Sequence, residues 1–189
     1  MKPAKSPKCR SCKKEFKPWN NLVRVCSMAC ALDHAGKEQQ TKKQKKLSER
    51  KREFLKNDLR HQKKRAQTAC NKYVRMRDEG MPCISCGNTN QSIKYDAGHF
   101  IPAGRSAALR FEETNIHRQC SNHCNVHLSG NYQNYRQAMI GKYGEQHVAW
   151  LEGPHEHPRW RAADYRRIAD EYRDKLKALK AREIQQTDL

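Results

Sequence analysis

The sequence has 189 residues, a formal net charge of +19 and a hydrophobic share of 36%. So small an apolar share excludes a large core, so one or two domains stapled by bound metal are expected. The charge favours a polyanionic partner such as nucleic acid. We expect no membrane partner because no run of 18 apolar residues occurs, and no secretion because the basic N-terminus has no apolar stretch. The chain is therefore expected to stay in a reducing cytoplasm.

The first predicted unit, residues 1–36, is a cysteine knuckle. Two close cysteine pairs with thirteen residues between them form it: Cys9, Cys12, Cys26 and Cys30. In a reducing compartment such pairs indicate metal rather than disulfides, and four thiolates from two tight turns suit tetrahedral zinc. Because cysteine fills every coordination position, we expect this zinc ion to be structural.

Residues 37–65 form a basic segment that we predict to be a solvated helical arm. The segment holds thirteen Lys and Arg residues against four Asp and Glu residues, and it lacks Gly and Pro. Its apolar residues are too sparse to pack well, so the arm is expected to join two modules. A lysine cluster within it is expected to contact nucleic-acid phosphates: Lys42, Lys43, Lys45 and Lys46.

The predicted core domain, residues 66–152, begins with an amphipathic helix over about residues 65–79. Gly80 and Pro82 end this helix, and Cys70 lies on its apolar face as an ordinary buried thiol. The elements expected after it are a hairpin with strands 93–95 and 99–101, a helix from about residue 125, and a helix over about 132–143. The predicted class is therefore a small, zinc-stapled α+β fold.

The C-terminal segment, residues 153–189, begins with a Gly-, Pro- and His-rich loop and continues as a helix over about 161–183. One stripe of that helix is apolar: Tyr165, Ile168, Ala169, Tyr172, Leu176 and Leu179. Such a stripe is either core or the seam of a homodimer, and the sequence leaves both interpretations open.

A second cysteine quartet lies inside the predicted core domain. Two close pairs with 33 residues between them form it: Cys83, Cys86, Cys120 and Cys124. The two quartets use eight of the nine cysteines, which buried core thiols do not explain, so a second structural zinc ion is predicted. Any catalytic chemistry is then expected to lie outside both quartets.

The second quartet encloses or adjoins the residue types that phosphodiester hydrolysis needs. The reaction requires a base for the attacking water and a cation beside the leaving oxygen. A neutral imidazole can supply the base, and one carboxylate with neutral ligands can hold a divalent ion. The residues of these types are Asp96, His99, Asn115, His117, Asn125 and His127, although packing is the preferred interpretation of His117. Three arginines are expected to clamp phosphates near the centre: Arg105, Arg110 and Arg118.

The segment resembles the HNH nucleases of the zinc-knuckle, or treble-clef, form. The matching features are Cys83-Ile-Ser-Cys86-Gly, a strand with Asp96 and His99, Asn115 five residues before Cys120, and Cys124-Asn125 opening a helix. The resemblance implies a ββα-metal core and a one-metal, His-base mechanism.

Carried over position by position, the resemblance assigns a role to each matching residue. It implies that His99 is the general base and that Asn115 orients it. Asp96 and Asn125 would bind a catalytic Mg²⁺ or Mn²⁺ ion, with His127 as a substitute or additional ligand.

One feature departs from the HNH pattern. Many HNH sequences have adjacent Asp and His residues, whereas Ala97 and Gly98 separate Asp96 from His99 here. Residues 96 and 99 of a regular strand point to opposite faces, so a bulge or bend at Gly98 is the expected means of bringing them together. The sequence does not decide whether Asp96 or His99 faces the metal. The third motif position is also open, because Asn125, His127 and His123 compete for it.

Over most of the chain the sequence is similar to the NinG (Rap) recombination proteins of lambdoid phages. The similar features are the two knuckles, the basic arm and the strings PCISCG, DAGH, NIHRQC and CN-x-H-x-SGN. The resemblance implies a structure-selective endonuclease cutting branched DNA, such as D-loops and Holliday junctions, in the bacterial host nucleoid beside other phage or host recombination proteins. The alternative that the residues leave open is a non-enzymatic zinc-knuckle protein that binds DNA or RNA.

Overall fold

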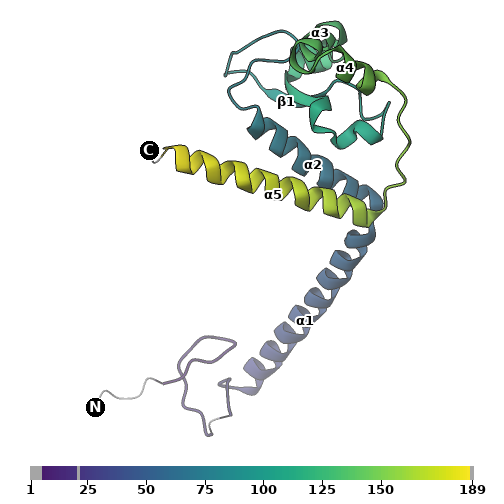
Figure 1. The fold of residues 1–189 in the computed structure, drawn as a ribbon. Helices are drawn as coiled ribbons and strands as arrows, with labels where there is room; N and C mark the ends of the chain where they lie inside the picture. Colours follow the sequence, from purple (N-terminus) through teal and green to yellow (C-terminus); the bar gives the residue numbers. More distant parts are fainter. Residues whose placement is uncertain (1–5, 21, 188–189) are drawn as a thin grey trace. The chain divides into compact units, whose positions relative to one another are not determined.

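The computed structural model describes residues 6–20 and 22–187 and divides the chain into two compact units, Met1–Leu55 and Lys56–Leu189. Figure 1 traces the order of the elements along the chain. Within the described residues, no helix combines the length and the apolar character that crossing a membrane would require.

The first unit consists of the cysteine knuckle and most of helix α1 (Met28–Asn57). An isolated bridge pairs Lys8 with Glu15, and the turn between them passes through Lys13 in the left-handed region, with φ 63°. Helix α1 is 30 residues long and has no buried residue, which confirms a solvated basic helix. The predicted bounds of 37–65 were wrong, because the helix starts inside the segment assigned to the knuckle and ends at Asn57.

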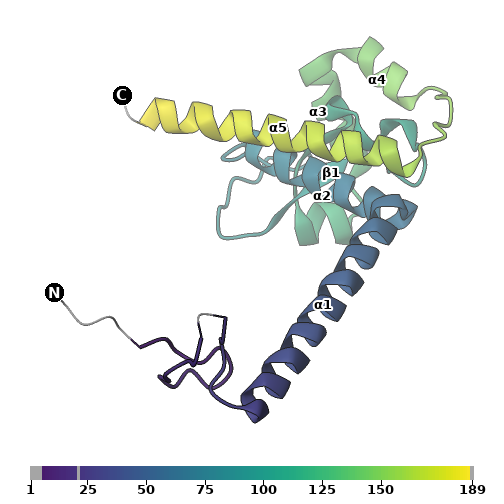
Figure 2. The ribbon, with the colours of Figure 1, turned by 90° about the horizontal axis from the view of Figure 1, so that it is seen from below.

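Helices α2 (Leu59–Arg77) and α5 (Ala162–Thr187) form the largest packing interface of the second unit and lie side by side in Figures 1 and 2. The Asp58 carboxylate caps α2 by accepting the His61 N–H at 2.6 Å, so α2 begins before the predicted residue 65. The apolar stripe of α5 packs on one face of α2 in a shared core: Ala66, Ala69, Cys70 and Val74 against Tyr165, Ile168, Ala169 and Tyr172. Core packing is therefore the correct interpretation of these stripe residues.

The sheet of the second unit has two antiparallel strands, β1 (Tyr95–His99) and β2 (Ile116–Cys120). The predicted hairpin of strands 93–95 and 99–101 was therefore wrong. The expected bulge at Gly98 is also absent, because the pairing is one to one and sets Gly98 opposite His117. A Cβ at Gly98 would lie 2.3 Å from Oε1 of Gln119, so this glycine permits a close approach rather than a bend.

Every residue of β2 is buried, because both faces of the sheet are covered. On one face Ala97 and Ile116 join the core formed by α2 and α5. On the other face His117 contacts helix α3 (Tyr132–Tyr143), which has the predicted bounds. The remaining elements are η1 (Ala108–Phe111), η2 (Glu113–Asn115), η3 (Ser121–His127) and α4 (Glu145–Glu152).

None of these four elements was predicted with its observed bounds. The helix expected from about residue 125 is the seven-residue π-helical segment η3, which starts at Ser121. Helix α4 was not predicted; its Val148 and Leu151 close a second core with Tyr135 and Met139 of α3. The mixed class of helices with a small antiparallel sheet is confirmed.

Candidate functional site

The first cysteine quartet has the geometry of a structural zinc site. The four Sγ atoms of Cys9, Cys12, Cys26 and Cys30 all lie within 4.8 Å of one another, and Cys26 Sγ is 3.6 Å from both Cys12 Sγ and Cys30 Sγ. A tetrahedral zinc ion with Zn–S bonds of about 2.3 Å places its sulfurs about 3.8 Å apart. Hydrogen bonds with Cys30 and other thiols raise the pKa of Cys26 to about 12, so a cation is needed before all four can ionise. The quartet can therefore hold zinc.

The second quartet meets the same test inside the second unit. The Sγ atom of Cys120 lies 3.6 Å from that of Cys86 and 3.5 Å from that of Cys83, and all four ligand atoms, with Cys124, fall within 4.8 Å. The Cys83 turn closes through the Gly87 N–H, which donates to the Cys83 carbonyl at 2.8 Å, with Gly87 at φ 69°. Since four thiolates would saturate each zinc ion, neither quartet leaves a coordination position for substrate.

The carboxylate of Asp96 lies beside the start of η3. Its Oδ2 accepts a hydrogen bond from Ser121 Oγ at 2.5 Å and lies 3.4 Å from Nδ2 of Asn125, while Lys94 Nζ is 3.8 Å from Oδ1. The Asp96 side chain is 28% exposed, so solvent reaches it. The structure thus brings together Asp96 and Asn125, the pair named from the sequence, across 29 residues. It adds Ser121, whose position directly after Cys120 was the available signal.

The atoms around Asp96 suit a hard divalent cation. Mg²⁺ takes oxygen ligands, and this cluster offers a carboxylate and a hydroxyl. Rotation of the Asn125 amide by half a turn would present Oδ1 in place of Nδ2 to a bound cation. The other two candidates for the third position, His123 and His127, are exposed on η3.

The ring of His99 is in the protonation state that a general base needs. Its Nε2 lies 3.1 Å from the carbonyl oxygen of Arg110, which can only accept, so Nε2 carries the proton and Nδ1 keeps its lone pair. Burial, with a smaller effect of the nearby Arg110 charge, lowers the pKa of His99 below its ordinary value. The imidazole is therefore neutral at pH 7.

The structure does not bring His99 to Asp96. Strand β1 pairs residue for residue with β2, so the side chains of positions 96 and 99 leave opposite faces of the sheet. Three residues along a strand also separate their Cα atoms by about 10 Å. The expected convergence of base and metal ligand is therefore not present in this arrangement.

Asn115 is fully buried and holds the loop that follows β1. Its Nδ2 donates to the carbonyls of Ile101 and Leu109, both at 3.0 Å, and its Oδ1 accepts the Ile101 N–H at 2.8 Å. Leu109 precedes Arg110, whose carbonyl oxygen contacts His99. Asn115 is therefore a positioning residue that acts through the loop.

The cations named from the sequence lie in different environments. Arg110 is near His99 and donates from Nη2 to the Ala103 carbonyl at 2.8 Å, whereas Arg105 is exposed in the loop. Arg118 is buried on the opposite face from Asp96, with its guanidinium 3.7 Å from the centre of the Tyr95 ring. The four named lysines are all exposed on α1: Lys42, Lys43, Lys45 and Lys46.

His117 and Cys70 have packing roles. The His117 ring lies between two phenols, 3.1 Å from the Tyr135 hydroxyl and 2.8 Å from the Tyr143 hydroxyl, and burial lowers its pKa to about 3. Burial raises the pKa of Cys70 to about 12 in the α2–α5 core. Both observations confirm the sequence-based interpretation.

Fold and site together define a class: a highly basic α+β protein with two tetracysteine clusters that can hold structural zinc ions. The family model described as "NinG: Bacteriophage Lambda NinG protein" matches residues 1–183, and the chain belongs to this family.

Similar phage proteins cover part of the chain. It is 44% identical over 117 residues to "Protein ninG" of Escherichia phage lambda, an alignment covering 62% of this chain and 56% of that relative. The corresponding proteins of Escherichia phage 933W and Salmonella phage P22 are also 44% identical over 117 residues, with 57% of each relative covered. The match thus spans a little over half the length of these relatives. No solved structure matches the chain.

Proposed function

We propose that the chain is a metal-dependent endonuclease that hydrolyses phosphodiester bonds in branched DNA recombination intermediates, such as D-loops and Holliday junctions. The observation that carries the proposal is the meeting of Asp96 with Asn125 and Ser121 directly beside the second cysteine quartet. The net charge of +19 supports a nucleic-acid substrate, and membership in a phage protein family supports DNA in an infected bacterial host.

Each residue has a defined task in this proposal. Asp96, Asn125 and Ser121 would hold a Mg²⁺ or Mn²⁺ ion, which when bound would stabilise negative charge on the leaving oxygen. His99 accepts the proton of the attacking water at Nδ1, since Nε2 is already donating to the Arg110 carbonyl. The Arg110 guanidinium, whose Nε is buried and has no hydrogen-bond partner among the described residues, offers a donor to a phosphate oxygen near His99.

A non-enzymatic zinc-knuckle protein that binds DNA or RNA is the second candidate function. The separation of His99 from Asp96 favours it, because the water that the base activates and the leaving oxygen that the metal stabilises must flank the same phosphorus atom, and a base acts within about 2.6–3.2 Å. Binding needs only the cations and the zinc-stapled frame. Cleavage by these residues therefore requires that binding of DNA or the divalent ion rearrange β1 so that His99 and Asp96 face the same phosphate.

Nicking assays with the full-length, zinc-loaded protein separate the two candidates. We expect nicks in a labelled Holliday junction and a D-loop, but not in linear duplex of the same sequence, once Mg²⁺ or Mn²⁺ is added. EDTA should stop the reaction, and after its removal zinc alone should not restore nicking whereas zinc with Mg²⁺ should.

The metal-ligand assignment is tested in the same assay by Asp96→Asn and Asn125→Ala. Both should abolish nicking while junction binding persists, and Asp174→Asn, which changes an exposed carboxylate on α5, should cut like the wild type. Tight junction binding without nicking under every divalent ion tested would establish the binding protein instead.

A further inference from the structure

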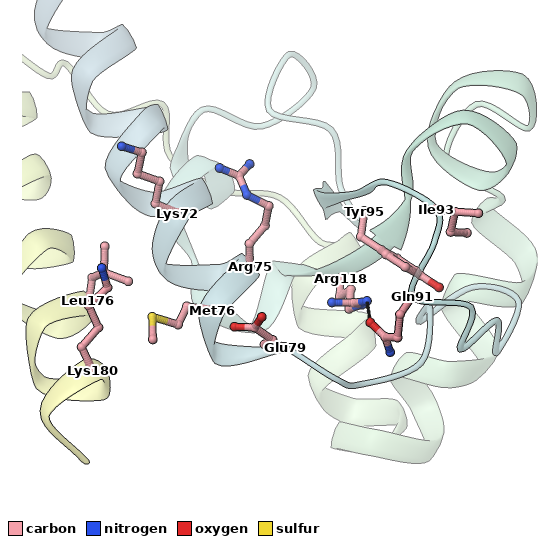
Figure 3. A pocket seen from close by; sticks show the side chains of 10 residues that line it. All are labelled: Lys72, Arg75, Met76, Glu79, Gln91, Ile93, Tyr95, Arg118, Leu176 and Lys180. Atoms are coloured by element: carbon pink, nitrogen blue, oxygen red, sulfur yellow. Dashed lines mark hydrogen bonds between the residues drawn. The ribbon is translucent and has the colours of Figure 1, made fainter. Parts of the chain in front are cut away.

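A cavity of about 590 Å³ opens between α2, α5 and the sheet, and its lining is rich in cations. Figure 3 shows Lys72 and Arg75 reaching it from α2, Lys180 from α5 and Arg118 from β2. Tyr95 and Arg118 belong to the sheet face opposite Asp96, because strand residues alternate between faces. The cavity is therefore distinct from the Asp96 site.

Arg118 gives this cavity a built anion-binding group. Its side chain is held by stacking 3.7 Å from the centre of the Tyr95 ring and by donation from Nη2 to Gln91 Oε1 at 3.0 Å. The residue is only 9% exposed, yet its Nε has no hydrogen-bond partner among the described residues. Leaving a buried charged donor unsatisfied is costly, so an anionic acceptor at this position would remove a penalty already present in the fold.

A second cavity of about 460 Å³ continues the basic lining along the same two helices. It shares Lys72 and Leu176 with the first cavity and adds Lys64, Arg65 and Arg173. Among the residues that the structure describes, Glu79 is the only carboxylate that lines either cavity. The occupant must therefore carry several anionic groups in a row, which a single phosphate or carboxylate does not.

We propose that these two neighbouring cavities, which share Lys72 and Leu176 and together are called the α2–α5 groove, bind the sugar–phosphate backbone of a nucleic-acid strand, with one phosphate at Arg118. This would be a second nucleic-acid contact on the far side of the sheet from Asp96. The proposal does not depend on cleavage, since it concerns binding without a divalent ion.

Binding measurements with matched charge variants test the groove. Full-length, zinc-loaded protein would be titrated into fluorescent duplex DNA over a range of salt concentrations without added divalent ion, and anisotropy recorded. Lys72→Gln and Lys180→Gln should each weaken binding about five- to tenfold at 0.1 M salt and lower the salt slope by about 0.9, the loss of one phosphate contact. Lys177→Gln, an exposed lysine on the same helix that does not line the groove, should change affinity less than about twofold. Equal losses in all three variants would overturn the proposal.

The Nε–Hε resonance of Arg118, identified by its absence in Arg118→Lys, provides a local readout. Duplex DNA should shift it saturably with the affinity seen by anisotropy, and inorganic phosphate should do so only at far higher concentration. No shift at saturating DNA, or equally tight binding of inorganic phosphate, would refute a backbone contact there. Asp96→Asn should show the wild-type shift, so failure of the nuclease proposal would leave this result standing.

Discussion

Substitution of Asn115 by alanine is expected to destabilise the second unit more than any other change in the proposed catalytic set. The fully buried Asn115 amide makes three hydrogen bonds to backbone groups of Ile101 and Leu109, and both of those residues are 2% exposed. The alanine variant strands the buried N–H and carbonyl of Ile101 and leaves the Leu109 carbonyl with the Glu112 N–H as its remaining donor. Each unsatisfied group costs about 1–3 kcal/mol, and a water entering the vacated space would offset part of this, so we expect a loss of about 3–5 kcal/mol.

Urea unfolding of the zinc-loaded protein, followed by circular dichroism, measures this loss. With a slope of about 2 kcal/mol per molar urea, the midpoint should fall by about 1.5–2.5 M. Hydrogen exchange adds a local test, because the Ile101 amide loses its acceptor and should exchange much faster in the variant.

Asn125→Ala is the matched control, since Asn125 is half-buried and its amide lies at a long 3.4 Å from Asp96. It should cost less than about 1 kcal/mol while still abolishing nicking. An Asn115→Ala protein with the wild-type midpoint and a protected Ile101 amide would refute the positioning role.

Three further predictions concern the frame of the site. Cys120→Ser should reduce bound zinc from two ions to one per chain, measured by mass spectrometry of the native protein, whereas Cys70→Ala should retain both; unchanged zinc in Cys120→Ser would contradict the quartet. Gly98→Ala should lower the free energy of unfolding by about 1–3 kcal/mol, because the new Cβ would overlap Gln119. Gly104→Ala, whose new Cβ would have no neighbouring atom within 4 Å, should be tolerated in the same urea unfolding experiment. Burial lowers the pKa of His117 to about 3, so the unfolded chain alone gains a proton on this residue as pH falls below about 6.5. The free energy of unfolding should therefore drop by up to about 1.4 kcal/mol for each pH unit in this range. His117→Gln should reduce this slope, and an unchanged slope in that variant would refute the neutral burial of His117.

The parts of the fold that sequence predicted correctly depend on local patterns. The cysteine quartets follow from close spacing within tight turns, and the α3 and α5 helices follow from apolar periodicity. Strand β2 could not be found this way, because Ile-His-Arg-Gln-Cys has no alternation of apolar and polar residues although every position is buried. Distant groups bind two of its polar side chains: the Tyr135 and Tyr143 hydroxyls contact the His117 ring, and Ser85 and the Gly130 carbonyl accept from Nε2 of Gln119.

The candidate site divides in the same way. Asp96 and Asn125 meet as the HNH pattern implies, because η3 starts directly after β2 and returns toward β1. The separation of His99 from Asp96 depends on the regularity of β1, which the pattern alone does not determine. Gln119 is held by hydrogen bonds of 2.6 Å to Ser85 and to Gly130 and lies against Gly98. Gly98, which was expected to bend the strand, therefore lies in a regular part of it.

The central claim is that His99 is the base of a nuclease, and single-turnover cleavage of a labelled Holliday junction by His99→Ala tests it most directly. With protein in excess, loaded with zinc and supplied with Mn²⁺, the wild type should nick the junction and His99→Ala should not. Both proteins should bind the junction with equal affinity. The control variants His123→Ala and His127→Ala change exposed histidines on η3 and show whether loss of nicking is specific to His99. Cleavage by His99→Ala at the wild-type rate would contradict the account.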